Sequence, residues 1–175
     1  TPQKKMTEYL NKIISIEFSD RKETESGFLI DFSGDWILLK SNPVDFIIDG
    51  YTIIRNKNIE AIYHEENEMF TEKVLRLKKL EPKENEKIPL ENISEIFKYI
   101  NERFGIFQFY KKSSKAIYPG KLREIDAEEI TIDWIDLKGN WAEERSFKLD
   151  KIRIIEFEND YLKSLKLIAD NNGFQ

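Results

Sequence analysis

The chain has 175 residues, with 33 Asp and Glu against 28 Lys and Arg, a single histidine and no cysteine. The lack of cysteine excludes disulfides, thiolate metal sites and a cysteine nucleophile, and one histidine excludes a multi-histidine metal site within the chain. No apolar run approaches the roughly 20 residues that a membrane-spanning helix needs, so we expect no membrane partner. With 13% aromatic and 35% charged residues, a folded core under a charged surface is expected.

Five short strands are predicted in the first half of the chain. Each is rich in Ile, Leu, Phe or Trp, with charged residues between them, which is the pattern of half-buried strands. The predicted strands are Ile13–Phe18, Gly27–Phe32, Trp36–Ser41, Tyr51–Arg55 and Ile59–His64. Ser33, Gly34 and Asp35 predict a tight turn between the second and third strands, with glycine supplying a positive φ.

Apolar residues at spacings of three and four predict two helices in the middle of the chain. The first lies between Met69 and Leu80, and the second covers Glu91–Phe104 and stops at Gly105. The stretch 81–90 between them begins with a proline-containing, charged run, which is typical of a linker. We therefore predict a first domain at 1–80, a linker at 81–90 and a second domain at 91–175.

The second domain repeats the first at a shift of 93 residues. Gly27-x-Leu29-x-x-Phe32 recurs as Gly120-x-Leu122-x-x-Ile125, and the apolar positions before and after it recur at the same offset. This pattern predicts an internal duplication. The second domain then holds a leading helix, five strands and a C-terminal helix, the last supported by the spacing of Tyr161, Leu162, Leu165 and Ile168.

We expect a mainly β protein with peripheral helices (β+α), built as two tandem five-stranded small barrels, each followed by a helix. Closure of each barrel would remove its exposed strand edges. The layout resembles SH3-type and Sm-like small barrels, and the segment 45–55, where Asp49-Gly50-Tyr51 leads into a strand, resembles an uncharacterised bacterial family of this sort. That resemblance implies a fold without a known activity. The glycine-containing RNA-binding signature of Sm proteins is not matched.

Differences between the two copies indicate where a partner could bind. Five positions are apolar in the first copy and polar in the second: Phe28, Ile30, Trp36, Leu38 and Ile53. They alternate with the matched core positions, so they are expected on the opposite face of their strands. Burying such side chains stabilises by roughly 1.5–3 kcal/mol each. This face is therefore expected to be covered, either by the helix at 91–104 or the second copy, or by a partner or second molecule.

Two further groups of residues are candidates for binding. Trp134 and Trp141 flank the loop 136–140, and tryptophans beside a loop are common both at protein interfaces and as lids of small barrels. A basic cluster with an aromatic neighbour lies between two predicted strands of the second copy: Tyr110, Lys111, Lys112 and Lys115. Such residues can follow a phosphate backbone and stack bases, or can form a solvated loop. The pI of about 5.2 disfavours nucleic acid as the partner.

No motif for catalysis, metal binding or a cofactor is present. His64 stands at a predicted strand end without an identifiable catalytic partner, and the acidic residues are too many for any pair to be informative. We therefore expect no enzyme, no cofactor and a cytoplasmic location. The first hypothesis is a non-catalytic protein–protein interaction module or structural adaptor that binds a protein or itself. The alternative is an Sm-like nucleic-acid-binding protein.

Overall fold

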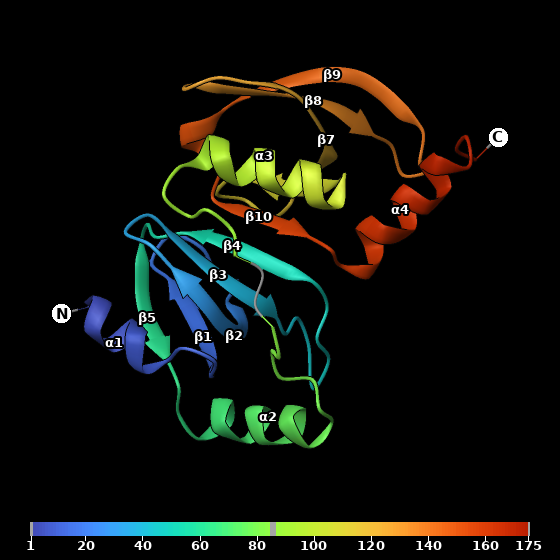
Figure 1. The fold of residues 1–175 in the computed structure, drawn as a ribbon. Helices are drawn as coiled ribbons and strands as arrows, with labels where there is room; N and C mark the ends of the chain where they lie inside the picture. Colours follow the sequence, from blue (N-terminus) through green and yellow to red (C-terminus); the bar gives the residue numbers. More distant parts are fainter. Residues whose placement is uncertain (1, 85–86, 175) are drawn as a thin grey trace. The chain divides into compact units, whose positions relative to one another are not determined.

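The computed structural model describes residues 2–84 and 87–174 and divides into two compact units, Thr1–Lys87 and Ile88–Gln175 (Figure 1). The division falls within the stretch 81–90 that the sequence marks as a linker. Because each unit forms its own contacts, each is described separately.

The N-terminal unit is a five-stranded antiparallel sheet with two helices (Figure 1). Its elements are α1 (Pro2–Glu8), β1 (Ile13–Phe18), β2 (Glu25–Phe32), β3 (Trp36–Ser41), β4 (Tyr51–Arg55), β5 (Ile59–Tyr63) and α2 (Glu66–Leu77). The strand order is β5-β1-β2-β3-β4. All five predicted strands are present: β1, β3 and β4 have the predicted bounds, β2 begins at Glu25 before the predicted Gly27, and β5 ends at Tyr63 before the predicted His64.

The C-terminal unit has the same strand order, β10-β6-β7-β8-β9, and all its pairings are antiparallel. Its elements are α3 (Ile93–Phe104), β6 (Phe107–Tyr110), β7 (Tyr118–Ile125), β8 (Glu129–Ile135), β9 (Trp141–Lys148), a 3-10 turn (Leu149–Lys151), β10 (Ile154–Phe157) and α4 (Asp160–Asp170). The Asn92 side chain caps α3 by accepting from two backbone N–H groups, and Gly105 ends it with a φ of 77°.

The prediction of two closed barrels was wrong. The strands are antiparallel and the sheet is open: in the part of each unit that the structure describes, no pairing joins the two ends of the strand order. The strand β5, for example, pairs only with β1 among the described residues. Alternation of apolar residues fixes which face of a strand is buried, but not whether the first and last strands meet. The coarser expectation, mainly β with peripheral helices, agrees with the structure.

The two sheets share one register at the offset of 93 residues. Gly27 pairs with Ser41 and Gly120 with Trp134, and the other pairings between equivalent strands match at the same offset. A bulge after Leu29 in β2 has its counterpart after Leu122 in β7. Equivalent residues of the two units therefore occupy equivalent backbone positions, so that their side chains can be compared directly.

The repeated glycine marks a close approach of two strands. A Cβ atom on Gly27 would lie 2.2 Å from the carbonyl oxygen of Lys40, and one on Gly120 would lie 2.5 Å from that of Asp133. No side chain fits there without moving a backbone. The turn glycine Gly34 differs from expectation, because its φ is not positive and nothing lies within 4 Å of an added Cβ.

Candidate functional site

The five apolar residues predicted to form a partner face are all buried. Phe28, Ile30, Trp36, Leu38 and Ile53 are between 0 and 6% exposed. Since binding needs an accessible side chain, none of them forms a surface in this structure.

The two tryptophans that flank the loop 136–140 enter different contacts. Trp134 is half-buried, and the guanidinium carbon of Arg145 lies 5.9 Å from its ring centre. Trp141 is 37% exposed, and Lys121 Nζ lies 4.2 Å from its ring centre. They do not form a joint lid over one cavity, although each contacts a cation.

The four residues of the predicted basic cluster do not all lie at the surface. Tyr110 is only 5% exposed and lies in β6, so its ring is not available for stacking. Lys111, Lys112 and Lys115 are exposed on the segment that follows β6. Of these three lysines, Lys111 reaches back over aromatic rings of the unit.

These rings form the base of a site that we call the cation–aromatic site: Lys111, Tyr118, Trp134, Arg145 and Phe147. The ring centres of Tyr118 and Phe147 are 4.5 Å apart. Lys111 Nζ lies 5.8 and 5.6 Å from these two centres, and the guanidinium carbon of Arg145 lies 5.3 and 5.8 Å from them. Two cations therefore converge on the same pair of rings, within the range of cation–π attraction.

Strand register explains why these side chains meet. Tyr118 opens β7 opposite Phe109 of β6, while Phe147 of β9 lies opposite the buried Ile130. Arg145 is two residues before Phe147 on the same strand, so it points to the same face. That face is the core face of the sheet, and Arg145 stands at its exposed margin.

Neither cation of the site is neutralised. Among the described residues, no carboxylate forms an ion pair with Lys111 or Arg145. The neighbouring Arg123 behaves differently, because it binds Asp133 at 3.0 Å and Glu144 at 2.9 Å. The cations of the site therefore carry uncompensated positive charge beside an aromatic surface.

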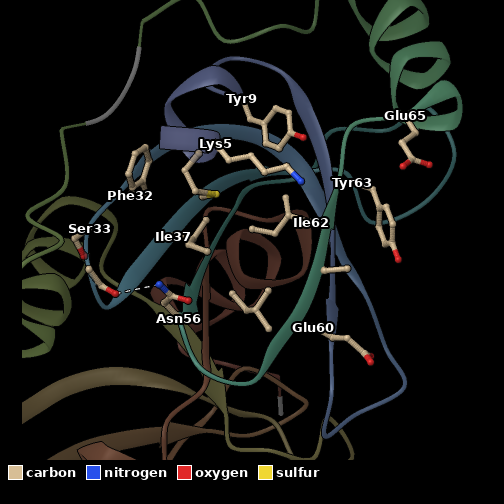
Figure 2. A pocket seen from close by; sticks show the side chains of 14 residues that line it. Lys5, Tyr9, Phe32, Ser33, Ile37, Asn56, Glu60, Ile62, Tyr63 and Glu65 are labelled. Atoms are coloured by element: carbon tan, nitrogen blue, oxygen red, sulfur yellow. Dashed lines mark hydrogen bonds between the residues drawn. The ribbon is translucent and has the colours of Figure 1, made fainter. Parts of the chain in front are cut away.

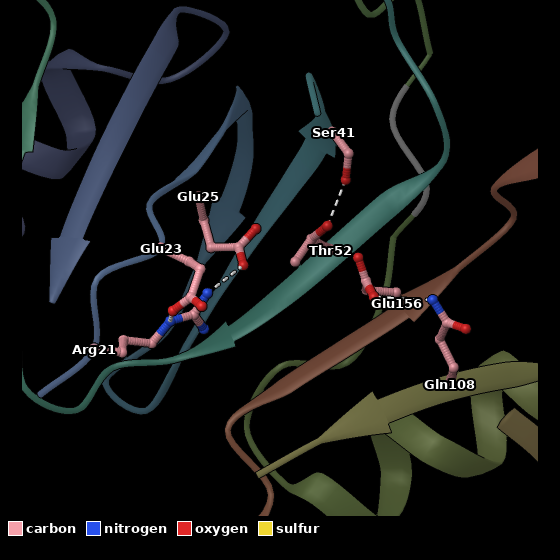
Figure 3. Close-up of polar contacts among 7 residues, drawn as sticks. All are labelled: Arg21, Glu23, Glu25, Ser41, Thr52, Gln108 and Glu156. Carbon is pink, nitrogen blue, oxygen red and sulfur yellow. Dashed lines mark hydrogen bonds and ion pairs between the residues drawn. The ribbon is translucent and has the colours of Figure 1, made fainter. Parts of the chain in front are cut away.

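The equivalent place in the N-terminal unit is built from different residues. At an offset of 93, Tyr118 corresponds to Glu25, Lys111 to Phe18 and Arg145 to Thr52. Here Arg21 lies over the Phe18 ring at 4.9 Å, but it is bound by Glu25 at 3.1 Å (Figure 3).

This N-terminal counterpart is closed and carries no excess positive charge. The Arg21 side chain is 4% exposed, and Glu23 lies 3.8 Å from it as a second carboxylate. Ser41 and Thr52 bond to each other where the C-terminal unit has Trp134 and Arg145 (Figure 3). On the same backbone frame, one unit thus holds a buried ion pair, and the other exposes two cations beside the half-buried rings of Tyr118 and Trp134, while the third ring, Phe147, is 8% exposed.

Sequence reasoning missed Arg145 as part of a site. In β9 the six residues 141–146 are all exposed. Burial therefore does not alternate along this part of the strand, and no pattern of apolar and polar residues shows which side chains point to the core face of the sheet. The offset of 93 residues between the two units could have identified Arg145. It makes Arg145 equivalent to Thr52, and the pair Arg145–Ile132 equivalent to the pair Thr52–Leu39.

A separate cavity of about 800 Å³ lies in the N-terminal unit beneath α1 and beside β5 (Figure 2). Its walls include Ile37, Ile62 and Tyr9. The charged residues in its lining are Lys5, Glu60 and Glu65, so both signs are present and the cavity does not select a ligand by charge. Nearby, His64 Nδ1 lies 2.7 Å from the carbonyl oxygen of Ile13, the first residue of β1, and this hydrogen bond links the residue after β5 to the start of β1.

Within the described residues, no group of three or more His, Asp or Glu side chains could hold a metal ion, and no helix is long and apolar enough to cross a membrane. No family model matches the chain, and neither a curated protein nor a solved structure matches it. The resemblance to Sm-like and SH3-type barrels therefore stays a prediction from the sequence.

Proposed function

We propose that the protein is a non-catalytic binding protein of the cytoplasm whose C-terminal unit binds single-stranded nucleic acid at the cation–aromatic site. The observation that carries this proposal is the convergence of Lys111 and Arg145, without a carboxylate, on the rings of Tyr118 and Phe147. A ligand that joins negative charge to flat rings satisfies both halves of such a site.

Single-stranded nucleic acid has this combination. Its phosphates bind cations, and its bases stack on aromatic side chains for about 1–3 kcal/mol per base. The half-buried Tyr118 and Trp134 offer ring surface, while the exposed Lys112 and Lys115 follow Lys111 and extend the positive charge along the strand path. A duplex hides its base faces, so the aromatic half of the site favours an unpaired strand.

The net charge of −5 does not oppose this proposal at close range. At physiological ionic strength the screening length is about 8 Å, so distant carboxylates contribute little to the potential at the site. The cations on the two rings dominate there. At low salt, where screening is weak, repulsion by the overall charge is expected to reduce the gain in affinity that counterion release gives.

The test is fluorescence anisotropy with labelled single-stranded RNA and DNA oligomers of about 12 nucleotides, a length within the usual site size of such binders. The variant K111Q/R145Q removes both cations of the site. The matched control is Lys121→Gln, which also removes a cation, here a half-buried one, from an aromatic ring but leaves the site intact. Circular dichroism shows that all variants are folded.

We expect the wild type and K121Q to bind with similar affinity. The plot of log K against log salt has a negative slope. For K111Q/R145Q its magnitude should decrease by about 1.4, since each lost phosphate contact removes about 0.7 on a single strand. Equal binding by K111Q/R145Q and K121Q, or no binding by the wild type, would refute the proposal. A mononucleotide that binds as tightly as the oligomer would assign the site to free nucleotides instead.

A further inference from the structure

A second surface lies in the N-terminal unit, between the loop 42–50 and α2. A groove of about 390 Å³ opens there, with walls that include Val44, Phe46 and Phe70. The loop leaves β3 and descends toward the C-terminal end of α2 (Figure 1), where Lys78 Nζ donates to the carbonyl oxygen of Phe46 at 2.6 Å. We call this surface the α2 groove.

The sequence builds the groove by ending a hairpin early. The segments 42–50 and 135–143 occupy equivalent places between paired strands. In the C-terminal unit the ladder continues to the pair Ile135–Trp141, leaving only a tight turn. In the N-terminal unit Pro43 has no N–H to continue the ladder. Asn42 Nδ2 instead donates to the carbonyl oxygens of Asp45 and Ile47, at 2.9 and 2.8 Å, and folds the segment into a broad loop.

The groove displays large apolar side chains to solvent. Val44 is 53% exposed and Phe70 is 61% exposed, and beside them Ile47 and Met69 are about half exposed. Phe46 and Phe70 meet edge to face with their centres 5.8 Å apart, so the loop and helix form one continuous apolar surface. Clustered exposed apolar side chains rimmed by polar groups mark interaction sites.

The charges in the groove are all of one sign. Its lining contains Asp45 and Glu68 but no lysine, arginine or histidine. Glu66, on the first turn of α2, adds a further exposed acid beside it. Lys78 is not among the lining residues, and its ammonium group donates to the backbone carbonyl oxygen of Phe46 at the groove wall. An occupant must therefore bring apolar side chains together with positive charge.

We propose that the α2 groove binds a basic amphipathic helix of a protein partner. A helix that alternates an apolar face with lysine or arginine places leucine-sized side chains between Val44 and Phe70 and its cations against Asp45 and Glu68. An anionic lipid or nucleic acid is repelled by the same acids. This inference is independent of the proposed nucleic-acid site, and the two together describe an adaptor with one macromolecule on each unit.

The test uses two synthetic helical peptides of about 14 residues, roughly four turns. Both carry the same leucine face, one with lysine on its polar face and the other with glutamate. Binding is measured by fluorescence anisotropy. The variant V44S/F70S removes exposed apolar groups from the groove, and Leu167→Ser on α4, 67% exposed in the other unit, is the matched control.

We expect the lysine peptide to bind the wild type and L167S about equally, and to bind V44S/F70S about tenfold more weakly or worse, a loss of roughly 1.4 kcal/mol. Asp45→Asn should weaken it by a smaller factor, because one of two acids is lost. K111Q/R145Q should leave the peptide affinity unchanged, so failure of the nucleic-acid proposal is separable from failure of this one.

Four results would overturn the inference. One is equal binding of the lysine peptide to wild type and V44S/F70S, and another is equal binding of the lysine and glutamate peptides. The third comes from sedimentation: a dimer that V44S/F70S dissociates would show that a second copy of the chain occupies the groove. Binding of neither peptide would also count against it, since the probe carries the chemistry proposed.

Discussion

Replacing Gly27 by alanine should destabilise the N-terminal unit. The added methyl group would lie 2.2 Å from the carbonyl oxygen of Lys40 and 3.0 Å from its carbonyl carbon, both of which belong to the neighbouring strand. Gly27 pairs with Ser41 in the middle of the sheet, so β2 and β3 cannot separate there without loss of ladder hydrogen bonds.

The magnitude follows from two opposing effects. Alanine restricts the unfolded chain and stabilises by about 0.4–1 kcal/mol where its backbone geometry is allowed. Overpacking in a well-packed interior costs about 1–3 kcal/mol, and it costs most where the contacted atom is backbone. With a contact more than 1 Å too short, we expect Gly27→Ala to lower the free energy of unfolding by about 2 kcal/mol.

The assay is urea denaturation, with the free energy of unfolding taken from the midpoint and slope. Gly34→Ala is the control, because nothing lies within 4 Å of its added Cβ and its φ is not positive. The counterpart of Gly34 at the offset of 93 is Ala127, so the other unit already uses alanine in this turn. We expect G34A to be as stable as the wild type or slightly more stable. The reasoning is refuted if G27A is as stable as G34A.

Three other outcomes are expected. Asn92→Ala removes the acceptor for two N–H groups at the start of α3 and should cost about 1 kcal/mol in urea denaturation; an unchanged midpoint would contradict the capping role. Glu25→Gln removes the nearer of the two carboxylates that pair with the buried guanidinium of Arg21 and should cost about 2–3 kcal/mol, so a variant as stable as the wild type would show that the ion pair contributes nothing. Backbone N–H groups of Asn140 and then Lys138 hold the pKa of Asp136 below its ordinary value. The stability that this carboxylate adds is therefore present above its unfolded-state pKa and is lost as the pH falls through the lowered pKa of the folded state. NMR titration should show a pKa of Asp136 below the ordinary value. Asp136→Asn should remove this part of the loss of stability in acid.

Local patterns in the sequence predicted the strands but not their closure. Apolar and polar residues alternate from Ile14 to Phe18, and short apolar runs such as the start of Trp36–Ser41 have the same β-prone composition, so strand identity is readable from the sequence. The repeated Gly27 and Gly120 predicted an internal duplication, and the structure places both glycines at equivalent positions of their sheets. Whether β5 meets β4 depends on bend and twist summed over a whole sheet, and no single segment encodes that sum.

The candidate site was predictable only in part. Lys111 was identified from its basic neighbours, and the ring of Tyr118 comes from the next strand, but the second cation, Arg145, comes from β9, which is distant in sequence. Their meeting depends on cross-strand pairing, which a linear pattern does not show. Tyr110, chosen for its place beside the lysines, is instead buried, because the strand alternation of β6 gives way to burial of all four of its residues.

The open sheet leaves β5 with one hydrogen-bonding edge that no described strand covers. Such an edge is a template on which another chain can add a strand and begin an aggregate. β5 limits this hazard by its length of five residues and by the exposed carboxylate of Glu60 within it. A short strand with a charge on it is a feature by which natural sheets disfavour edge-to-edge joining of neighbouring molecules.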